Sequence, residues 1–124
     1  LTNGSRAHAD AVLARLGFGD QFEDLFDIIA AEFEPKPARR PYEMFLKLHA
    51  IEPTRAAMFE DLPRNLEVPH ELGIRTVLVT GDEIENDGHR ADWEIAKGTE
   101  PYVQHVTNDL AQFLVSVCER RKLV

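Results

Sequence analysis

The chain has 124 residues, of which 44% are hydrophobic, and its 22 acidic against 14 basic side chains give a formal net charge of −8. This length corresponds to one domain that can bury a core, which argues against a disordered chain. The acidity argues against a nucleic-acid polymer or an anionic membrane as a partner.

Apolar runs in the sequence are much shorter than the roughly 20 residues that cross a bilayer. With a single cysteine and no signal-peptide pattern, a cytoplasmic protein is expected.

The chain opens on Leu1 and a turn-like run at residues 2–5, so we expect it to start within a domain. A helix is predicted next, because apolar residues recur every three to four positions up to the helix stop Gly17. Its inward positions are Ala9, Val12, Leu13 and Leu16. The short apolar run Leu25–Ala31 predicts a buried strand, and the loop 32–41 follows it.

The middle of the chain alternates helices and strands. Pro41 opens a second predicted helix, since a proline at the first position loses no hydrogen bond. Residues 56–60 predict a second buried strand, and residues 63–72 predict a helix that Pro69 kinks or divides into two pieces. Residues 74–79 predict a third strand. The inward positions of the second helix are Tyr42, Phe45, Leu46 and His49.

The C-terminal part begins with the acidic stretch 82–87, which is typical of a solvated loop. Asn108 is expected to cap a last helix. Its apolar stripe comprises Leu110, Phe113, Leu114, Val117 and Cys118, and we expect the cysteine to be a packed, inert thiol. Helices that alternate with fully apolar strands predict an α/β fold with a parallel sheet.

Chemistry in such sheets gathers at the carboxyl ends of the strands, which selects three places. Thr2, Asn3 and Gly4 precede a helix, where a hydroxyl and main-chain N–H groups can bind phosphate oxygens. A plain capping turn is the alternative. Lys36 lies between two prolines that restrict its backbone, which suits neutralisation of a phosphate or a carboxylate. A solvated surface lysine is the alternative for that position.

The third place is the acidic pair Glu60 and Asp61 at the end of a buried strand. Two adjacent carboxylates are costly to desolvate unless a cation compensates them. Mg²⁺ fits this role, because it takes oxygen ligands and often needs one or two carboxylates. The alternative is that Asp61 caps the following helix. The histidine spacings do not predict a zinc site.

Together, these places resemble motifs of the haloacid dehalogenase superfamily, over Leu1–Val79. Thr2 matches the second motif of that superfamily and Lys36 matches the third. The fourth motif is matched by Glu60, Asp61 and Asn65. Within the superfamily, the opening string LTNG and the string HVTNDLAQFL near the C-terminus are most similar to the pyrimidine 5′-nucleotidase group.

The resemblance implies a three-layer Rossmann-like core and a Mg²⁺-dependent phosphomonoesterase of nucleoside monophosphates that works through an aspartyl-phosphate. It implies that Thr2 and the N–H of Asn3 hold the phosphoryl group of a small phosphorylated substrate. Lys36 would bridge the nucleophile and the transferring group. Asp61 would bind Mg²⁺ directly. The ion's waters would be bound by Glu60 and Asn65.

One motif of the superfamily is missing from the sequence. Its first motif is Asp-x-Asp, whose leading aspartate is the nucleophile, and no two aspartates here have that spacing. We therefore expect residues 1–124 to be the C-terminal portion of a single core domain whose nucleophile strand and cap lie upstream. With the family strand order 5-4-1-2-3, the remaining sheet would have a gap between Leu25–Ala31 and Ala56–Glu60.

Other functions stay open from the residues. These 124 residues alone are expected to be inactive, because the covalent step lacks its nucleophile. The alternatives are another hydrolase of the superfamily, such as a 2-haloacid dehalogenase, a sugar-phosphate mutase, or a truncated phosphate-binding module without catalysis.

Overall fold

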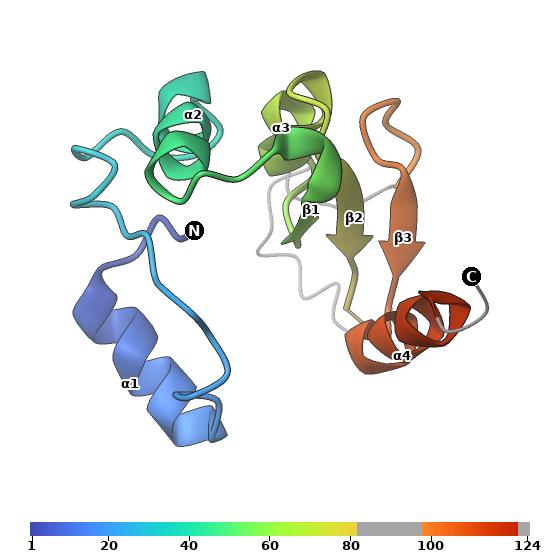
Figure 1. Ribbon diagram of the computed structural model, residues 1–124, viewed down its shortest axis with the longest axis horizontal. Helices are drawn as coiled ribbons and strands as arrows, with labels where there is room; N and C mark the ends of the chain where they lie inside the picture. The colour runs from blue at the N-terminus through green and yellow to red at the C-terminus, as the bar shows by residue number, and fades with distance from the viewer. Residues whose placement is uncertain (82–97, 122–124) are drawn as a thin grey trace, which may run out of the picture. The chain divides into compact units, whose positions relative to one another are not determined.

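The computed structural model describes residues 1–81 and 98–121. The chain divides into two compact units, residues 1–52 and 53–124, called here the N-terminal and C-terminal units. The N-terminal unit contains two helices, α1 (Arg6–Leu16) and α2 (Arg39–Leu48) (Figure 1). The C-terminal unit contains β1 (Ala57–Glu60), α3 (Glu67–Glu71), β2 (Arg75–Val79), β3 (His105–Thr107) and α4 (Leu110–Arg121). That all 124 residues belong to one core domain stays a prediction.

Helix α1 has the ends that its sequence predicts. Ser5 caps it by accepting a hydrogen bond from the N–H of His8. Gly17 ends it in the left-handed region at φ 75°, where glycine avoids the steric penalty of a side chain. The N–H of Phe18 then donates to the carbonyl oxygen of Leu13 at 2.9 Å. These bonds satisfy polar groups that a helix end would otherwise leave without partners.

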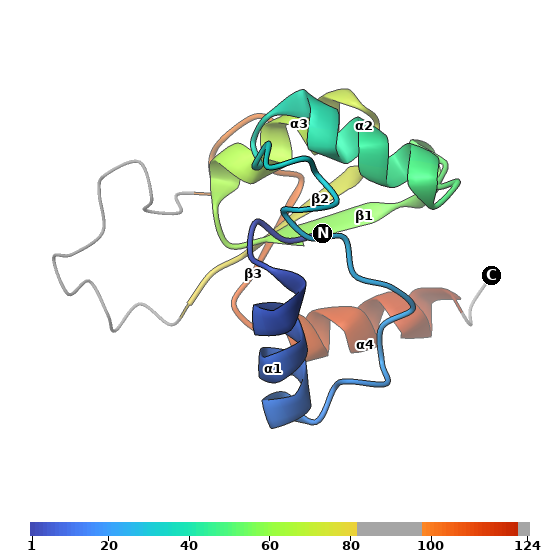
Figure 2. The same ribbon diagram turned by 90° about the vertical axis from the view of Figure 1, so that its left-hand side faces the viewer.

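The apolar face of α1 is less buried than its pattern predicts. Ala9 and Leu13 are half-buried, whereas Val12 and Leu16 remain 41% and 60% exposed. Figure 2 shows that the segment after α1 runs back alongside the helix toward its N-terminal end.

The strand predicted at Leu25–Ala31 is wrong. Residues 28–33 form turns instead, with a hydrogen bond from the N–H of Ala31 to the carbonyl oxygen of Asp27 at 3.0 Å. The Asp27 carboxylate also accepts the N–H of Ala30 at 2.9 Å. Short polar side chains that bond to the nearby backbone compete in this way with strand pairing, so an apolar run does not suffice to make a strand.

Helix α2 begins at Arg39, two residues before the predicted start at Pro41. Proline is tolerated there because the first N–H groups of a helix have no partner within it. The inward face is confirmed: Tyr42 and Leu46 are buried, and Phe45 and His49 are half-buried. Phe26 packs edge-on against Phe45 with ring centroids 5.8 Å apart.

The sheet of the C-terminal unit is parallel and has the order β1-β2-β3. This confirms the predicted α/β class, and β1 and β2 lie within one residue of the strands predicted at 56–60 and 74–79. Val77 and Leu78 of β2 are almost fully buried. β3 was not predicted, because three residues with one apolar side chain between polar neighbours give too short a signal. The sheet lies as one layer in Figure 1.

Between β1 and β2 the predicted helix is indeed in two pieces. A 3₁₀ turn at Pro63–Leu66 is followed by α3, so the break precedes Pro69 rather than falling on it. Gly73 at φ 90° then ends α3, and the N–H of Ile74 donates to the carbonyl oxygen of Pro69 at 2.9 Å. This tight return leads directly into β2.

A buried hydroxyl joins β2 to the segment that precedes β3. The Thr76 side chain, 0% exposed, donates to the carbonyl oxygen of Tyr102 at 2.6 Å. It also accepts the N–H of Gln104 at 3.2 Å. In addition, the side-chain oxygen of Gln104 accepts a hydrogen bond from the N–H of Thr76 at 3.0 Å. Thr76 therefore fixes the entry to the third strand.

We predict that Thr76→Val destabilises the protein by about 1–3 kcal/mol, because two part-buried main-chain groups lose their partner. Thr80→Val is the matched control, since the Thr80 hydroxyl makes a long 3.4 Å bond to the carbonyl oxygen of Thr107. Urea unfolding followed by circular dichroism measures both. Equal losses of unfolding free energy in the two variants would contradict the role given to Thr76.

Helix α4 differs from the prediction at its start and on its stripe. Asp109, not Asn108, caps it, because the Asp109 carboxylate accepts the N–H of Gln112 at 2.9 Å. Phe113 packs edge-on against Phe59 at 6.0 Å between centroids. Cys118 is an exposed thiol, so its assignment to a packed position is wrong. The acidic stretch 82–87 lies outside the described residues.

None of the helices in the described ranges, 1–81 and 98–121, is long and apolar enough to span a membrane.

Candidate functional site

The turn before α1 is fixed by its own hydroxyl and by the segment after the helix. The Thr2 oxygen accepts the N–H of Gly4 at 3.1 Å. The N–H of Thr2 donates to the carbonyl oxygen of Phe26 at 2.9 Å, and that of Ile28 donates to the carbonyl oxygen of Gly4 at 3.2 Å. A hydroxyl has one hydrogen and two lone pairs, so accepting from Gly4 leaves the Thr2 hydrogen available to a ligand oxygen.

Asn3 joins this turn to Lys36, 33 residues later in the chain. Its side-chain oxygen accepts the N–H of Lys36 at 2.8 Å, and its side-chain nitrogen donates to the carbonyl oxygen of Lys36 at 3.2 Å. The peptide bond from Lys36 to Pro37 is cis. The structure thus joins the turn at residues 2–4 to the main chain of Lys36. The Asn3 side chain makes this contact, which the sequence did not predict.

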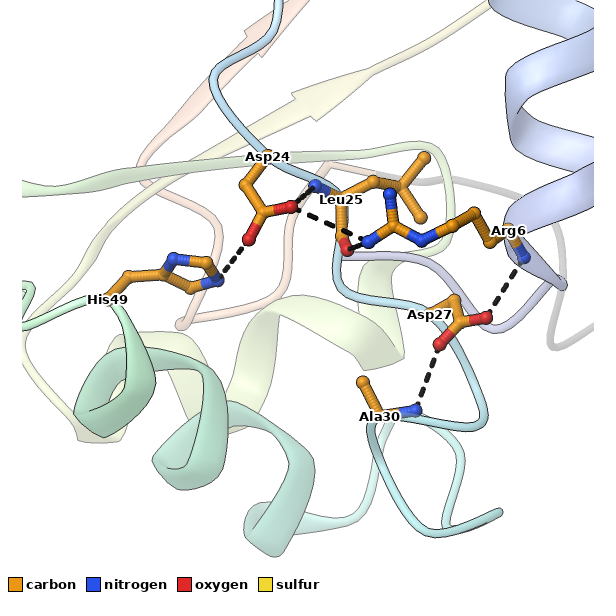
Figure 3. A network of polar contacts seen from close by, with 6 residues as sticks. All are labelled: Arg6, Asp24, Leu25, Asp27, Ala30 and His49. Atoms are coloured by element: carbon orange, nitrogen blue, oxygen red, sulfur yellow. Dashed lines mark hydrogen bonds and ion pairs between the residues drawn. The ribbon is translucent and has the colours of Figure 1, made fainter.

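Asp27 holds the start of α1 against the same segment. One carboxylate oxygen accepts the N–H of Arg6 at 3.0 Å and the other accepts the N–H of Ala30 at 2.9 Å (Figure 3). These bonds, first that from Ala30, lower the pKa of the Asp27 carboxyl below its usual value. Sequence reasoning missed Asp27 because it placed the residue inside a strand. The sequence did hold one signal against a strand, since an acidic residue such as Asp27 is uncommon within an apolar strand.

Arg6, Asp24 and His49 form a second group of charges, which lies beside Asp27 (Figure 3). The Arg6 guanidinium donates to the carbonyl oxygen of Leu25 and lies 3.5 Å from the Asp24 carboxylate. The His49 Nε2 atom lies 3.6 Å from the other Asp24 oxygen. The N–H of Leu25, followed by Arg6 and His49, lowers the pKa of Asp24. Arg6 and Asp24 are about half exposed, and an ion pair at such positions contributes little to the stability of the fold.

We predict that Asp27 makes the protein sensitive to acid. A depressed pKa means that the unfolded state takes up the proton first, so the contribution of Asp27 is complete above the unfolded value of about 4 and is lost as the pH falls through the lower folded value. Asp27→Asn should lower the urea midpoint at about pH 7 and flatten its decline toward about pH 3.

The control for that measurement is Asp10→Asn, on the exposed surface of α1. It should follow the wild-type curve of urea midpoint against pH. If the urea midpoint falls with decreasing pH as steeply in Asp27→Asn as in the wild type, the role given to Asp27 is wrong.

An open pocket of about 320 Å³ adjoins the turn at residues 2–4. Thr2, His8 and Asp24 contribute its polar lining, and apolar side chains of α1 and the following loop contribute the rest. His8 itself is exposed on the helix surface. The pocket offers room beside the Thr2 hydroxyl for the non-reacting part of a small ligand.

The acidic residues lie in the C-terminal unit, at the carboxyl end of β1. Glu60 is 8% exposed, Asp61 is exposed, and Asn65 on the 3₁₀ turn is 3% exposed. That turn has Leu62 at its cap position and no side-chain capping bond, so the interpretation of Asp61 as a helix cap is wrong.

The oxygen-only donor set at β1 suits a hard cation. Among residues 1–81 and 98–121, no three histidine, cysteine or acidic side chains cluster as a ready metal site. Mg²⁺ does not require such a cluster, because it keeps several waters and takes one or two carboxylates. The assignment of Asp61 as a direct ligand, with the buried Glu60 and Asn65 close to it in sequence, is compatible with that mode of binding and stays a prediction.

The parallel sheet and its helices define an α/β protein. A family model described as haloacid dehalogenase-like hydrolase matches residues 1–68. The chain belongs to the haloacid dehalogenase-like hydrolases. The matched range contains the six candidate site residues, which are Thr2, Asn3, Lys36, Glu60, Asp61 and Asn65. No curated protein matches the chain.

Proposed function

We propose that the complete protein is a Mg²⁺-dependent phosphomonoesterase that acts on nucleoside monophosphates, in the manner of the pyrimidine 5′-nucleotidases. Its reaction passes through an aspartyl-phosphate whose aspartate lies outside residues 1–124. The observation that supports this most is the pairing of Asn3 with Lys36, because it joins the turn at residues 2–4 to the main chain of a lysine 33 residues later in the sequence.

In this proposal the N-terminal unit binds the phosphoryl group. The Thr2 hydroxyl donates its free hydrogen to one phosphoryl oxygen, and the N–H of Asn3 donates to the same group. The Lys36 ammonium neutralises the charge that develops on the phosphoryl group and the attacking carboxylate. Fixed donors of this kind lower the barrier because they need no rearrangement during the reaction.

The C-terminal unit supplies the metal ligands in the same proposal. Asp61 binds Mg²⁺ through its exposed carboxylate, and Glu60 and Asn65 orient the waters of the ion. When bound, the ion contributes positive charge that offsets the charge of the phosphate and of the aspartate.

The substrate is a small phosphorylated molecule and not a nucleic-acid polymer or a membrane. The net charge of −8 supports this, since a polyanion would be repelled. The similarity of the strings LTNG and HVTNDLAQFL to the nucleotidase group supports the nucleotide, and the single cysteine supports a cytoplasmic place of action.

A second candidate is favoured by one observation, the absence of an Asp-x-Asp motif from the 124 residues. By themselves these residues would then be a phosphate-binding module without turnover. Another hydrolase of the family or a sugar-phosphate mutase would use the same phosphate turn and lysine.

We predict that Lys36→Met in the full-length protein lowers kcat/KM for Mg²⁺-dependent phosphate release from uridine or cytidine 5′-monophosphate by roughly 100- to 1,000-fold, the usual cost of removing one transition-state donor. Lys47→Met, an exposed lysine of α2, is the matched control and should keep wild-type activity. Wild-type protein that releases no phosphate from any monophosphate would contradict the proposed function.

We predict that Asp61→Asn lowers activity and raises the Mg²⁺ concentration for half-maximal activity by at least about tenfold, because a neutral amide binds the cation less well. A Mg²⁺ titration of phosphate release measures this. Asp109→Asn, which alters a helix cap remote in sequence, serves as the control. An unchanged titration in Asp61→Asn would exclude Asp61 from the site.

A further inference from the structure

We propose that the Asn3 side chain is a positioning residue for Lys36: it holds the main chain of the lysine so that the ammonium reaches the phosphoryl group bound at Thr2. This inference rests on the proposed function and goes beyond it. There, Asn3 contributes its main-chain N–H to phosphate, whereas here its carboxamide acts on a second residue.

The two hydrogen bonds are complementary in their chemistry. The carboxamide presents one acceptor and one donor, and the Lys36 peptide groups present one donor and one acceptor in return, at 2.8 and 3.2 Å. A carboxylate would lack the donor, and a hydroxyl is too short to reach both groups. The asparagine thus fixes the position of the Lys36 main chain as well as its distance from the turn.

The contact is anchored on the turn at residues 2–4, to which the proposed function assigns the phosphate. Thr2 is held by its bond to the carbonyl oxygen of Phe26, and its oxygen accepts the N–H of Gly4. Asn3 lies between these two residues. The same short turn therefore places the Thr2 hydroxyl and the origin of the lysine side chain. In our proposal this common support lets both donors serve one phosphoryl group.

The effect of losing Asn3 should appear in catalysis rather than in stability. Asn3 is exposed, and hydrogen bonds at exposed positions contribute little to folding, because water replaces them. A displacement of a catalytic group by about 1 Å, in contrast, can reduce the rate by roughly 100-fold. Substrate binding through the Thr2 turn would persist, so kcat should fall more than KM rises.

The test is a double-mutant cycle in the full-length protein with Asn3→Ala, Lys36→Met and the double variant. Phosphate release from uridine 5′-monophosphate with Mg²⁺ gives kcat and KM. We expect Asn3→Ala to lower kcat by roughly 10- to 100-fold. In the Lys36→Met background the same change should alter kcat by less than about twofold, because the group being positioned is already gone.

The controls separate positioning from folding. Asn108→Ala, an exposed asparagine before α4, should leave both constants unchanged, and Asn3→Ala should keep the wild-type thermal midpoint. Asn3→Ser, too short to bridge both Lys36 groups, is the second variant and should behave as the alanine does.

Three results would overturn the inference while leaving the proposed function intact, provided that Lys36→Met is impaired. They are unchanged kcat in both Asn3 variants, an equal loss in the Lys36→Met background, or a loss that follows a lowered thermal midpoint in both variants. A wild-type protein without Mg²⁺-dependent phosphate release, or an unimpaired Lys36→Met, would overturn the proposed function and this inference together.

Discussion

The candidate site depends on one contact, the pair of hydrogen bonds between the Asn3 carboxamide and the main chain of Lys36. Loop segments 33 residues apart lose much conformational freedom when they are held together, so such a contact needs support from both sides. Asp27 provides that support by bonding the N–H groups of Arg6 and Ala30. The start of α1 and the approach to Lys36 are thereby held by these side-chain bonds and by the main-chain bonds from Thr2 to Phe26 and from Ile28 to Gly4, without a regular strand.

The regular elements were predictable where a periodic pattern is long or where a strand is fully apolar. Residues 56–60 and 74–79 contain such apolar runs, and the structure has β1 and β2 there. The run at Leu25–Ala31 looks similar but leads into turns, because the Asp27 carboxylate accepts a hydrogen bond from the nearby N–H of Ala30. β3 was missed, since its pairing with β2 is specified by the partner strand rather than by its own three residues.

For the candidate site, residue types and spacing predicted which side chains matter but not how they are held. Thr2 and Lys36 were selected as phosphate ligands, and the structure joins their segments. The contributions of Asp27 and of the Asn3 side chain were not predicted, because a bond between a side chain and a distant main chain leaves no periodic trace in the sequence. At the acidic end, the sequence left open whether Asp61 binds a metal or caps a helix. Leu62 at the cap position excludes the cap, and the metal role stays a prediction.

The turn at Thr2 and Asn3, together with Lys36, is proposed here as a phosphate site. The most direct measurement is a titration of the isotope-labelled full-length protein with inorganic phosphate, followed by the chemical shifts of its main-chain amides. We expect saturable shifts at Asn3, Gly4 and Lys36 that are lost in Lys36→Met. Shifts that are small, linear in phosphate and spread over the surface, or centred on other residues, would contradict it.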